Sequence, residues 1–116
     1  MSKKSKEVLL RHMLDHAQEA VGFIQGKRRE DLNTDRMRTL ALTRLLEVIG
    51  EAAARMPAEV AAAHPQIPWA QIVALRNRLI HGYDNVDLDI LWKILTDDLP
   101  PLIAALQAIL ASESAP

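Results

Sequence analysis

Apolar residues recur every three or four positions along most of the chain, and this spacing is the strongest constraint on the fold. Side chains three and four residues apart share one face of an α-helix, whereas a half-buried strand needs alternation, which no segment shows. Apolar residues make up 49% of the chain and aromatic residues only 3%, so the expected core is aliphatic and rich in alanine. Because this composition favours helices over strands, the sequence predicts an all-α protein.

Glycines, prolines and polar clusters divide the periodic pattern into an up-and-down bundle of four or five helices. The expected helices span approximately residues 4–26, 35–56, 68–81, 88–99 and 101–111. Pro100 and Pro101 are expected to kink or break the last helix, because proline lacks an N–H and clashes with the preceding turn. At 116 residues the chain is predicted to be a single domain, 1–116, with a frayed tail over 112–116.

Particular residues mark the expected ends of these helices. The cluster 33–35 supplies N-cap candidates for the second helix, and Asp87 supplies one for the fourth. Gly82 is expected to end the third helix, since glycine readily adopts the left-handed conformation just past a helix end. Residues 58–67 are predicted to form a short helical turn and a loop.

The chain contains no cysteine, which excludes disulfides, thiolate metal sites and cysteine nucleophiles. No continuous apolar run approaches the roughly 18 residues of a membrane span, and the basic start lacks the apolar region of a signal peptide. We therefore expect a soluble cytoplasmic protein with no membrane contact. No cofactor is expected either.

Charge is unevenly distributed although the net charge is only −1. Residues 1–38 hold nine Lys and Arg against six Asp and Glu, whereas residues 39–116 hold five against nine. Such a basic rim favours local RNA contact over broad coating of nucleic acid. Lys27, Arg28 and Arg29 are the candidate RNA-binding residues, with a solvated linker as the alternative.

Two groups of residues invite a metal-site interpretation that the spacing does not favour. His12 and His16 lie four apart on the first expected helix, but no third ligand is evident. Asp84, Asp87 and Asp89 lack the spacing and terminal glutamate of a calcium loop. Surface, turn and capping roles are favoured for these residues, and no metal site is predicted.

Residues 76–83 carry the candidate chemistry. Arg76 offers a charged fork that matches a phosphate, His81 can exchange protons near neutral pH, and Asn77 and Tyr83 add an amide and a hydroxyl. Arg76 and His81 are about 140° apart on an ideal helix, so they converge only if His81 lies at the helix end. There it could turn toward Arg76 or toward a second copy of the chain, which predicts a dimer.

The chain resembles the HepT toxin branch of the HEPN-domain proteins through the motif R-N-x-x-x-H-x-Y, formed here by Arg76, Asn77, His81 and Tyr83. Flanking segments resemble that branch as well, namely Ile49–Ala53, Ile67–Trp69, Val86–Asp87, Trp92 and Asp98–Pro100. The resemblance covers roughly residues 35–110. It is therefore much more specific than a bare R-x-x-x-x-H pattern.

The resemblance implies a helical homodimer of HEPN type whose two motifs build one composite cleft. It implies a metal-independent endoribonuclease that acts as the toxin of a type VII-like toxin–antitoxin pair, with tRNA among the candidate substrates. The implied antitoxin is a minimal nucleotidyltransferase of the MntA type, which transfers AMP to the tyrosine of H-x-Y, here Tyr83. The alternative function is a non-catalytic HEPN dimer that binds nucleotide or docks such a nucleotidyltransferase.

Metal-independent RNA cleavage assigns a role to each candidate residue. The 2′-hydroxyl attacks the adjacent phosphate with His81 as acid or base, while Arg76 neutralises the developing charge and Asn77 supports it. Glu51 is the candidate for orienting Arg76 or His81, with Glu47 as the substitute one turn earlier. An ion-pairing surface arginine, a helix-capping histidine, a packing tyrosine and a structural salt bridge at Glu51 remain the alternatives.

Overall fold

The computed structural model describes the backbone of residues 3–81 and 85–114, and the side chains of residues 5–80 and 85–113. Helices dominate these residues, which confirms the predicted all-α class. The elements in chain order are α1 (Lys3–Gly22), the 3-10 helix η1 (Arg29–Thr34), α2 (Arg36–Ala54), α3 (Ala58–Ala63), α4 (Trp69–Val73), α5 (Leu75–Leu79), β1 (Ile80–His81), β2 (Asn85–Val86), α6 (Leu88–Lys93), the π-helical turn η2 (Ile94–Asp98) and α7 (Leu99–Ser114).

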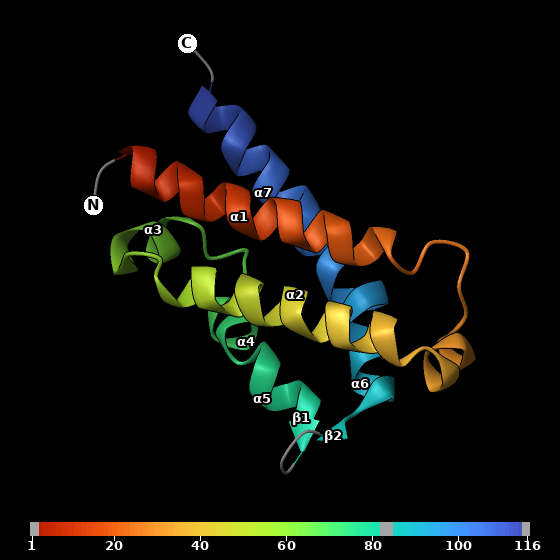
Figure 1. The fold of residues 1–116 in the computed structure, drawn as a ribbon. Coiled ribbons are helices and arrows are strands. Elements are labelled where there is room, and N and C mark those ends of the chain that lie inside the picture. Colours follow the sequence, from red (N-terminus) through yellow and green to blue (C-terminus); the bar gives the residue numbers. More distant parts are fainter. Residues whose placement is uncertain (1–2, 82–84, 115–116) are drawn as a thin grey trace.

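The long helices pack around one aliphatic core. Helix α1 lies between α2 and α7, while α4 and α5 pack against α2 (Figure 1). The residues with no exposed surface at the centre of this core include Leu10, Met13, Leu42, Leu46, Ile49, Leu75, Leu79, Leu91, Ile94, Leu95, Leu99 and Leu106. These are the periodic apolar positions of the sequence, so hydrophobic burial determines how each helix is rotated about its axis.

Capping fixes the start of α2 and of α6. The Asp35 carboxylate accepts hydrogen bonds from the Arg38 backbone N–H at 3.0 Å and from Arg38 Nε at 2.8 Å. These bonds stabilise the ionised form, the backbone bond most, and so lower the pKa of Asp35 below its ordinary 3.8. Asp87 accepts from the Ile90 N–H at 3.0 Å. Both capping predictions are therefore confirmed.

The end of α1 differs from the prediction. The helix ends at Gly22, four residues before the expected end. Gly26 lies in the following turn with φ +74°, a left-handed conformation that glycine adopts without steric cost. The glycine therefore marks the turn and not the helix end.

The predicted third helix, residues 68–81, is two short helices. It is interrupted at Ala74 and ends at Leu79, so Gly82 does not end it. Ile80 is extended, with φ −101° and ψ 120°, and pairs across an antiparallel ladder with Val86, while His81 pairs with Asn85. The Leu79 carbonyl accepts a hydrogen bond from the Asp87 N–H at 2.8 Å. These bonds from the returning chain replace the last helical turn.

A continuous helical path runs from α6 through η2 into α7. Pro100 and Pro101 are the second and third residues of α7, and they do not interrupt it. The departure from α-helical geometry is the wider π turn Ile94–Asp98 directly before them. A proline ring collides with the carbonyl four residues earlier in a regular α-helix. The wider π turn contains the carbonyls four residues before Pro100 and Pro101, so it relieves this collision. Helix continues to Ser114, so part of the predicted frayed tail is helical.

One helical stretch, Leu88–Glu113, is long and apolar enough to cross a membrane by length and composition alone, with a mean hydropathy of 1.4 over 18 residues. Leu91, Leu95 and Leu106 of this stretch are fully buried in the bundle, whereas Leu88, Ile90 and Ile103 are partly buried. A core helix of a bundle meets the same criterion, and 39% of this window is buried inside the protein.

Candidate functional site

Helix α5 presents Arg76 and Asn77 at the surface beside α2. Leu75 and Leu79 on the same helix are fully buried, whereas Asn77 is exposed and the Arg76 side chain is 62% exposed. The two leucines anchor the apolar face of α5 in the core, so the opposite face must carry its polar residues outward. Burial of the leucines thus determines where the Arg76 guanidinium points.

Gly50 lets α2 approach the segment that carries Arg76. A Cβ at this position would lie 3.1 Å from the Ile72 carbonyl oxygen and 3.4 Å from that of Val73. Both oxygens belong to the backbone of α4, which cannot rotate away as a side chain can. Glycine therefore permits the close contact of α2 with α4 and sets the distance from α2 to Arg76.

Two arginines and two glutamates lie along this contact, and we call them the α2–α5 charge cluster: Arg44, Glu47, Glu51 and Arg76. Glu47 Oε2 lies 3.7 Å from Arg76 Nε and 3.7 Å from Arg44 Nη1. Arg44 Nη1 also lies 3.6 Å from Glu51 Oε1. These ion pairs are longer than hydrogen bonds, so they orient the guanidiniums without holding them in one geometry.

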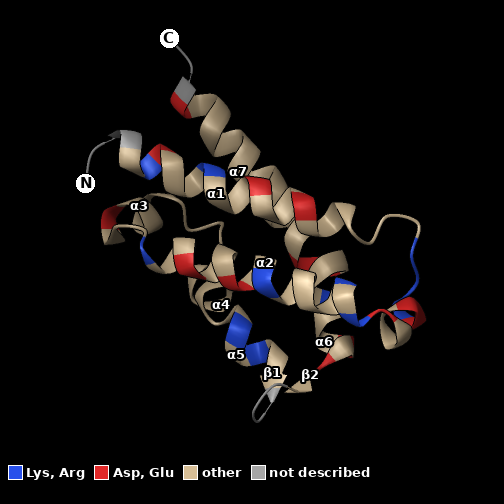
Figure 2. Cartoon of the chain, viewed as in Figure 1, with Lys and Arg blue, Asp and Glu red and all other residues tan. Residues whose placement is uncertain are grey.

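The orienting partner of Arg76 is Glu47, the substitute in the sequence analysis, and Glu51 pairs with Arg44 instead. Figure 2 shows acidic and basic turns of α2 beside the basic residues of α5. Glu47, Glu51, Arg76 and Asn77 line a shallow depression of about 200 Å³. Arg44 had no assigned role, although its spacing of three and seven residues from the two glutamates places all three on one helix face.

His81 is placed by its backbone alone. It is the last residue of β1, two residues after α5 ends, and pairs with Asn85 of β2. The His81 side chain and the whole of Tyr83 lie outside the described residues. The hairpin therefore puts the His81 backbone directly after the helix that exposes Arg76.

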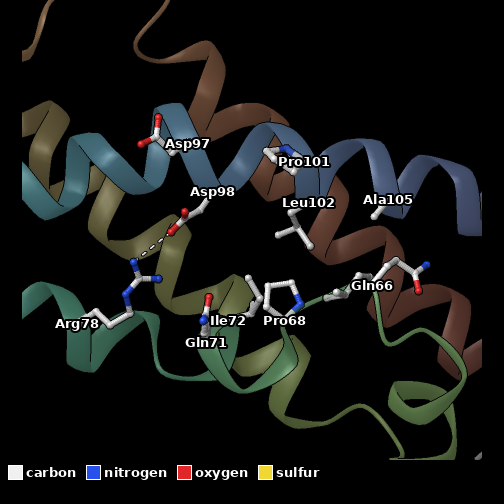
Figure 3. Close-up of a pocket in the computed structure, with 11 residues that line it drawn as sticks. Gln66, Pro68, Gln71, Ile72, Arg78, Asp97, Asp98, Pro101, Leu102 and Ala105 are labelled. Atoms are coloured by element: carbon white, nitrogen blue, oxygen red, sulfur yellow. Dashed lines mark hydrogen bonds and ion pairs between the residues drawn. The ribbon is translucent and has the colours of Figure 1, made fainter.

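Arg78, two residues after Arg76, belongs to a different part of the molecule. Residues two apart on a helix point about 200° apart, and Arg78 Nη2 pairs with Asp98 Oδ2 of η2 at 3.1 Å. This pair closes one end of a separate cavity of about 280 Å³ between α4, α5 and α7, with Ile72 and Leu102 in its wall (Figure 3). Arg78 thus fastens α5 to the π turn and leaves the exposed face to Arg76.

The basic segment before α2 is engaged with nearby acidic and amide groups. Arg28 Nη1 lies 3.3 Å from Glu30 Oε1, while Arg29 donates to Asp89 at 2.6 Å and to Asn33 at 2.9 Å. The segment precedes the N-terminus of α2, whereas the cluster residues Arg44, Glu47 and Glu51 lie further along that helix. RNA binding by Lys27, Arg28 and Arg29 stays a prediction.

Within the described part of the chain, no group of three or more His, Asp and Glu side chains could hold a metal ion. His12 and His16 lie on exposed or half-exposed helix surface, with ring centres 6.1 Å apart. His16 Nδ1 lies 2.7 Å from the His12 carbonyl oxygen, to which it donates. Asp87 caps α6 and Asp89 pairs with Arg29, consistent with the capping and surface roles favoured above.

An aliphatic helical bundle that exposes an arginine on a short helix and places a histidine five residues later, just past its end, defines a helical domain of the HEPN type. Within that class the chain belongs to the HepT-like ribonuclease family, whose description "Ribonuclease HepT-like" matches residues 13–109. The match includes every residue of the charge cluster, together with Asn77 and His81.

Related proteins carry ribonuclease names. The chain is 38% identical over 93 residues to "Probable ribonuclease HepT" of Thermococcus cleftensis, covering 77% of this chain and 84% of that protein. It is 33% identical over 110 residues to a "Putative RNase" of Caldanaerobacter subterraneus subsp. tengcongensis, covering 95% and 98%. A "Putative RNase" of Methanocaldococcus jannaschii is 33% identical over 102 residues, with 88% and 94% covered. No solved structure matches the chain.

Proposed function

We propose that this chain is a metal-independent endoribonuclease in which Arg76 and His81 act on the scissile phosphate. The observation that carries the proposal is the exposed Arg76, held by a single loose ion pair among the described residues and followed within five residues by His81. An arginine needed only for stability would be expected to form a tighter pair, as Arg78 does at 3.1 Å. The ribonuclease family supports the same assignment.

The reaction uses the nucleophile that RNA itself carries. The 2′-oxygen forms a bond to phosphorus as the bond to the 5′-oxygen breaks, which leaves a 2′,3′-cyclic phosphate and a 5′-hydroxyl. His81 takes the proton from the 2′-hydroxyl or gives one to the leaving oxygen, a contribution of about 10²–10⁴-fold. Arg76 neutralises the charge that develops on the phosphoryl oxygens. Asn77, in the same depression, hydrogen-bonds the phosphate or holds Arg76.

A homodimer completes this scheme because one histidine cannot serve as base and acid in the same step. Two copies supply two histidines, one for each proton. The exposed positions of Arg76 and Asn77 support an interface there, since a second copy could reach them without unfolding either bundle.

We further propose that the chain is a toxin controlled by a nucleotidyltransferase of the MntA type. In this scheme the Tyr83 oxygen attacks the α-phosphorus of ATP, pyrophosphate leaves, and AMP remains on the tyrosine. Tyr83 lies two residues after His81, so the added phosphate would compete with RNA for Arg76. The resemblance of the H-x-Y motif supports this control.

Purified protein in EDTA is expected to cleave tRNA or bulk RNA and to leave a DNA strand of matched sequence intact, because DNA lacks the 2′-hydroxyl. A denaturing gel measures cleavage, and mass spectrometry of the fragments identifies cyclic phosphate ends. Cleavage of the DNA as well would contradict the proposed mechanism. Cleavage of neither would favour the non-catalytic function, in which the dimer docks a nucleotidyltransferase.

Tyr83→Phe is expected to retain RNA cleavage and to lose inhibition by the nucleotidyltransferase and ATP, because phenylalanine has no oxygen to accept AMP. Intact mass spectrometry before and after treatment measures the adduct, and the cleavage assay measures the inhibition. Wild-type protein treated without ATP is the control. If the Phe variant gained the same added mass as the wild type, the modification would belong to another residue.

A further inference from the structure

The α2–α5 charge cluster contains a second exposed arginine, and its side chain is 64% exposed. Arg44 Nη1 and Arg76 Nε each lie 3.7 Å from the same oxygen, Glu47 Oε2. The two nitrogens are therefore separated by no more than twice that distance. Adjacent phosphates of an RNA strand are spaced on that scale, so one strand can reach both guanidiniums.

The ion pairs of Arg44 leave it free to bind an anion. All its pairs within the described chain are 3.6 Å or longer, and no hydrogen bond to a carboxylate is formed. Exposed pairs of this kind contribute little to stability. In addition, arginine placed before glutamate is the weaker order for stabilising a helix. Helix stability alone therefore gives little reason for an arginine at this position.

The position of Arg44 also connects the two ends of the proposed site. One turn further along α2, Glu47 faces Arg76; one turn earlier, Leu40 lines a hollow that includes Asn85 and Val86 of the β2 strand. Arg44 thus lies on α2 between the turn that faces Arg76 and the turn that faces β2.

We propose that Arg44 is a substrate-binding residue that contacts an RNA phosphate next to the scissile one. In the free protein both guanidiniums lie beside the Glu47 carboxylate, and the two phosphates replace this carboxylate as their partner. This assignment rests on the proposed ribonuclease function for the identity of the substrate. It concerns the affinity for RNA and not the cleavage step.

The test is the affinity for an uncleavable RNA oligonucleotide that carries 2′-O-methyl groups, measured by fluorescence anisotropy over a range of salt concentrations. For Arg44→Gln we expect the Kd to rise about tenfold, the effect of losing one charge-assisted hydrogen bond. The slope of log Kd against log salt should fall by about 0.7, the value for one phosphate of a single strand. Arg44→Lys should keep the slope and part of the affinity.

Arg11→Gln is the matched control, because it removes the same exposed charge from α1, which α2 separates from α5 in Figure 1. An unchanged Kd for Arg44→Gln, or an equal loss in both variants, overturns the assignment. So does a changed oligomeric mass for Arg44→Gln in light scattering, since the arginine would then be an interface residue. Wild-type protein that binds this RNA but does not cleave unmodified RNA disproves only the nuclease function.

Discussion

His81→Ala is expected to abolish metal-independent RNA cleavage, with a loss of at least about 10²-fold, because alanine can neither accept nor donate the proton that the reaction transfers. Binding of uncleavable RNA should change little, since the phosphate contacts belong to arginines. The loss would therefore fall on kcat, with KM nearly unchanged. Single-turnover cleavage in EDTA, followed on a denaturing gel, measures the rate of the cleavage step.

His64→Ala is the matched control for the histidine substitution. His64 lies at the end of α3, in the loop before α4. Its backbone carbonyl accepts a hydrogen bond from Trp69 Nε1 at 3.0 Å. Alanine preserves that carbonyl, so cleavage by this variant should match the wild type. Equal cleavage by wild type and His81→Ala would remove His81 from the chemistry and with it the proposed mechanism.

The sequence predicted the fold well where one physical effect dominates. The periodic positions Leu42, Leu46 and Ile49 are fully buried, because removal of apolar area from water outweighs every local preference along α2. Asp35 caps α2 as predicted, since an unsatisfied helix N-terminus needs an acceptor within two or three residues. Both features are local in sequence, and local patterns are what a sequence displays.

The errors lie where distant segments decide the structure. The third helix was predicted to run to residue 81, but β2 pairs with Ile80 and draws the chain out of the helix. A ladder of two residue pairs is too short to produce an alternating pattern. Likewise, Arg78 pairs with Asp98 twenty residues away on another helix, a partner that spacing along the sequence does not indicate.

The candidate site divides in the same way. Arg76 and His81 are predicted from residue type and from the motif that they form in the sequence, and their catalytic roles stay predictions. For the partner of Arg76 the sequence favours Glu51, whereas the structure pairs Arg76 with Glu47. Both glutamates lie on one face of α2, one turn apart, so sequence spacing does not separate them. The packing of α4 against Gly50 decides between them by setting where α5 lies beside α2.

Gly50→Val is expected to destabilise the protein by about 1–3 kcal/mol, the usual cost of overpacking a close contact, and to weaken RNA binding in the variant that still folds. The new Cβ would lie 3.1 Å from the Ile72 carbonyl oxygen, so α4 must move away from α2. Ile72 and Leu75 are buried on either side, and their packing resists that movement. Thermal unfolding gives the stability, and anisotropy with uncleavable RNA gives the affinity.

Alanine substitutions at two glycines separate this steric effect from helix propensity. Alanine in a helix interior is favoured over glycine by roughly 0.5–1 kcal/mol, so propensity alone predicts that Gly50→Ala stabilises α2. At Gly22, at the end of α1, a Cβ meets no atom within 4 Å, and Gly22→Ala should be neutral or slightly stabilising. We expect Gly50→Ala to be destabilising and Gly50→Val more so. A stabilised Gly50→Ala variant with wild-type RNA affinity would show that α4 can recede at little cost. The position of Arg76 would then depend on the burial of Leu75 and Leu79 and on the ion pair with Glu47.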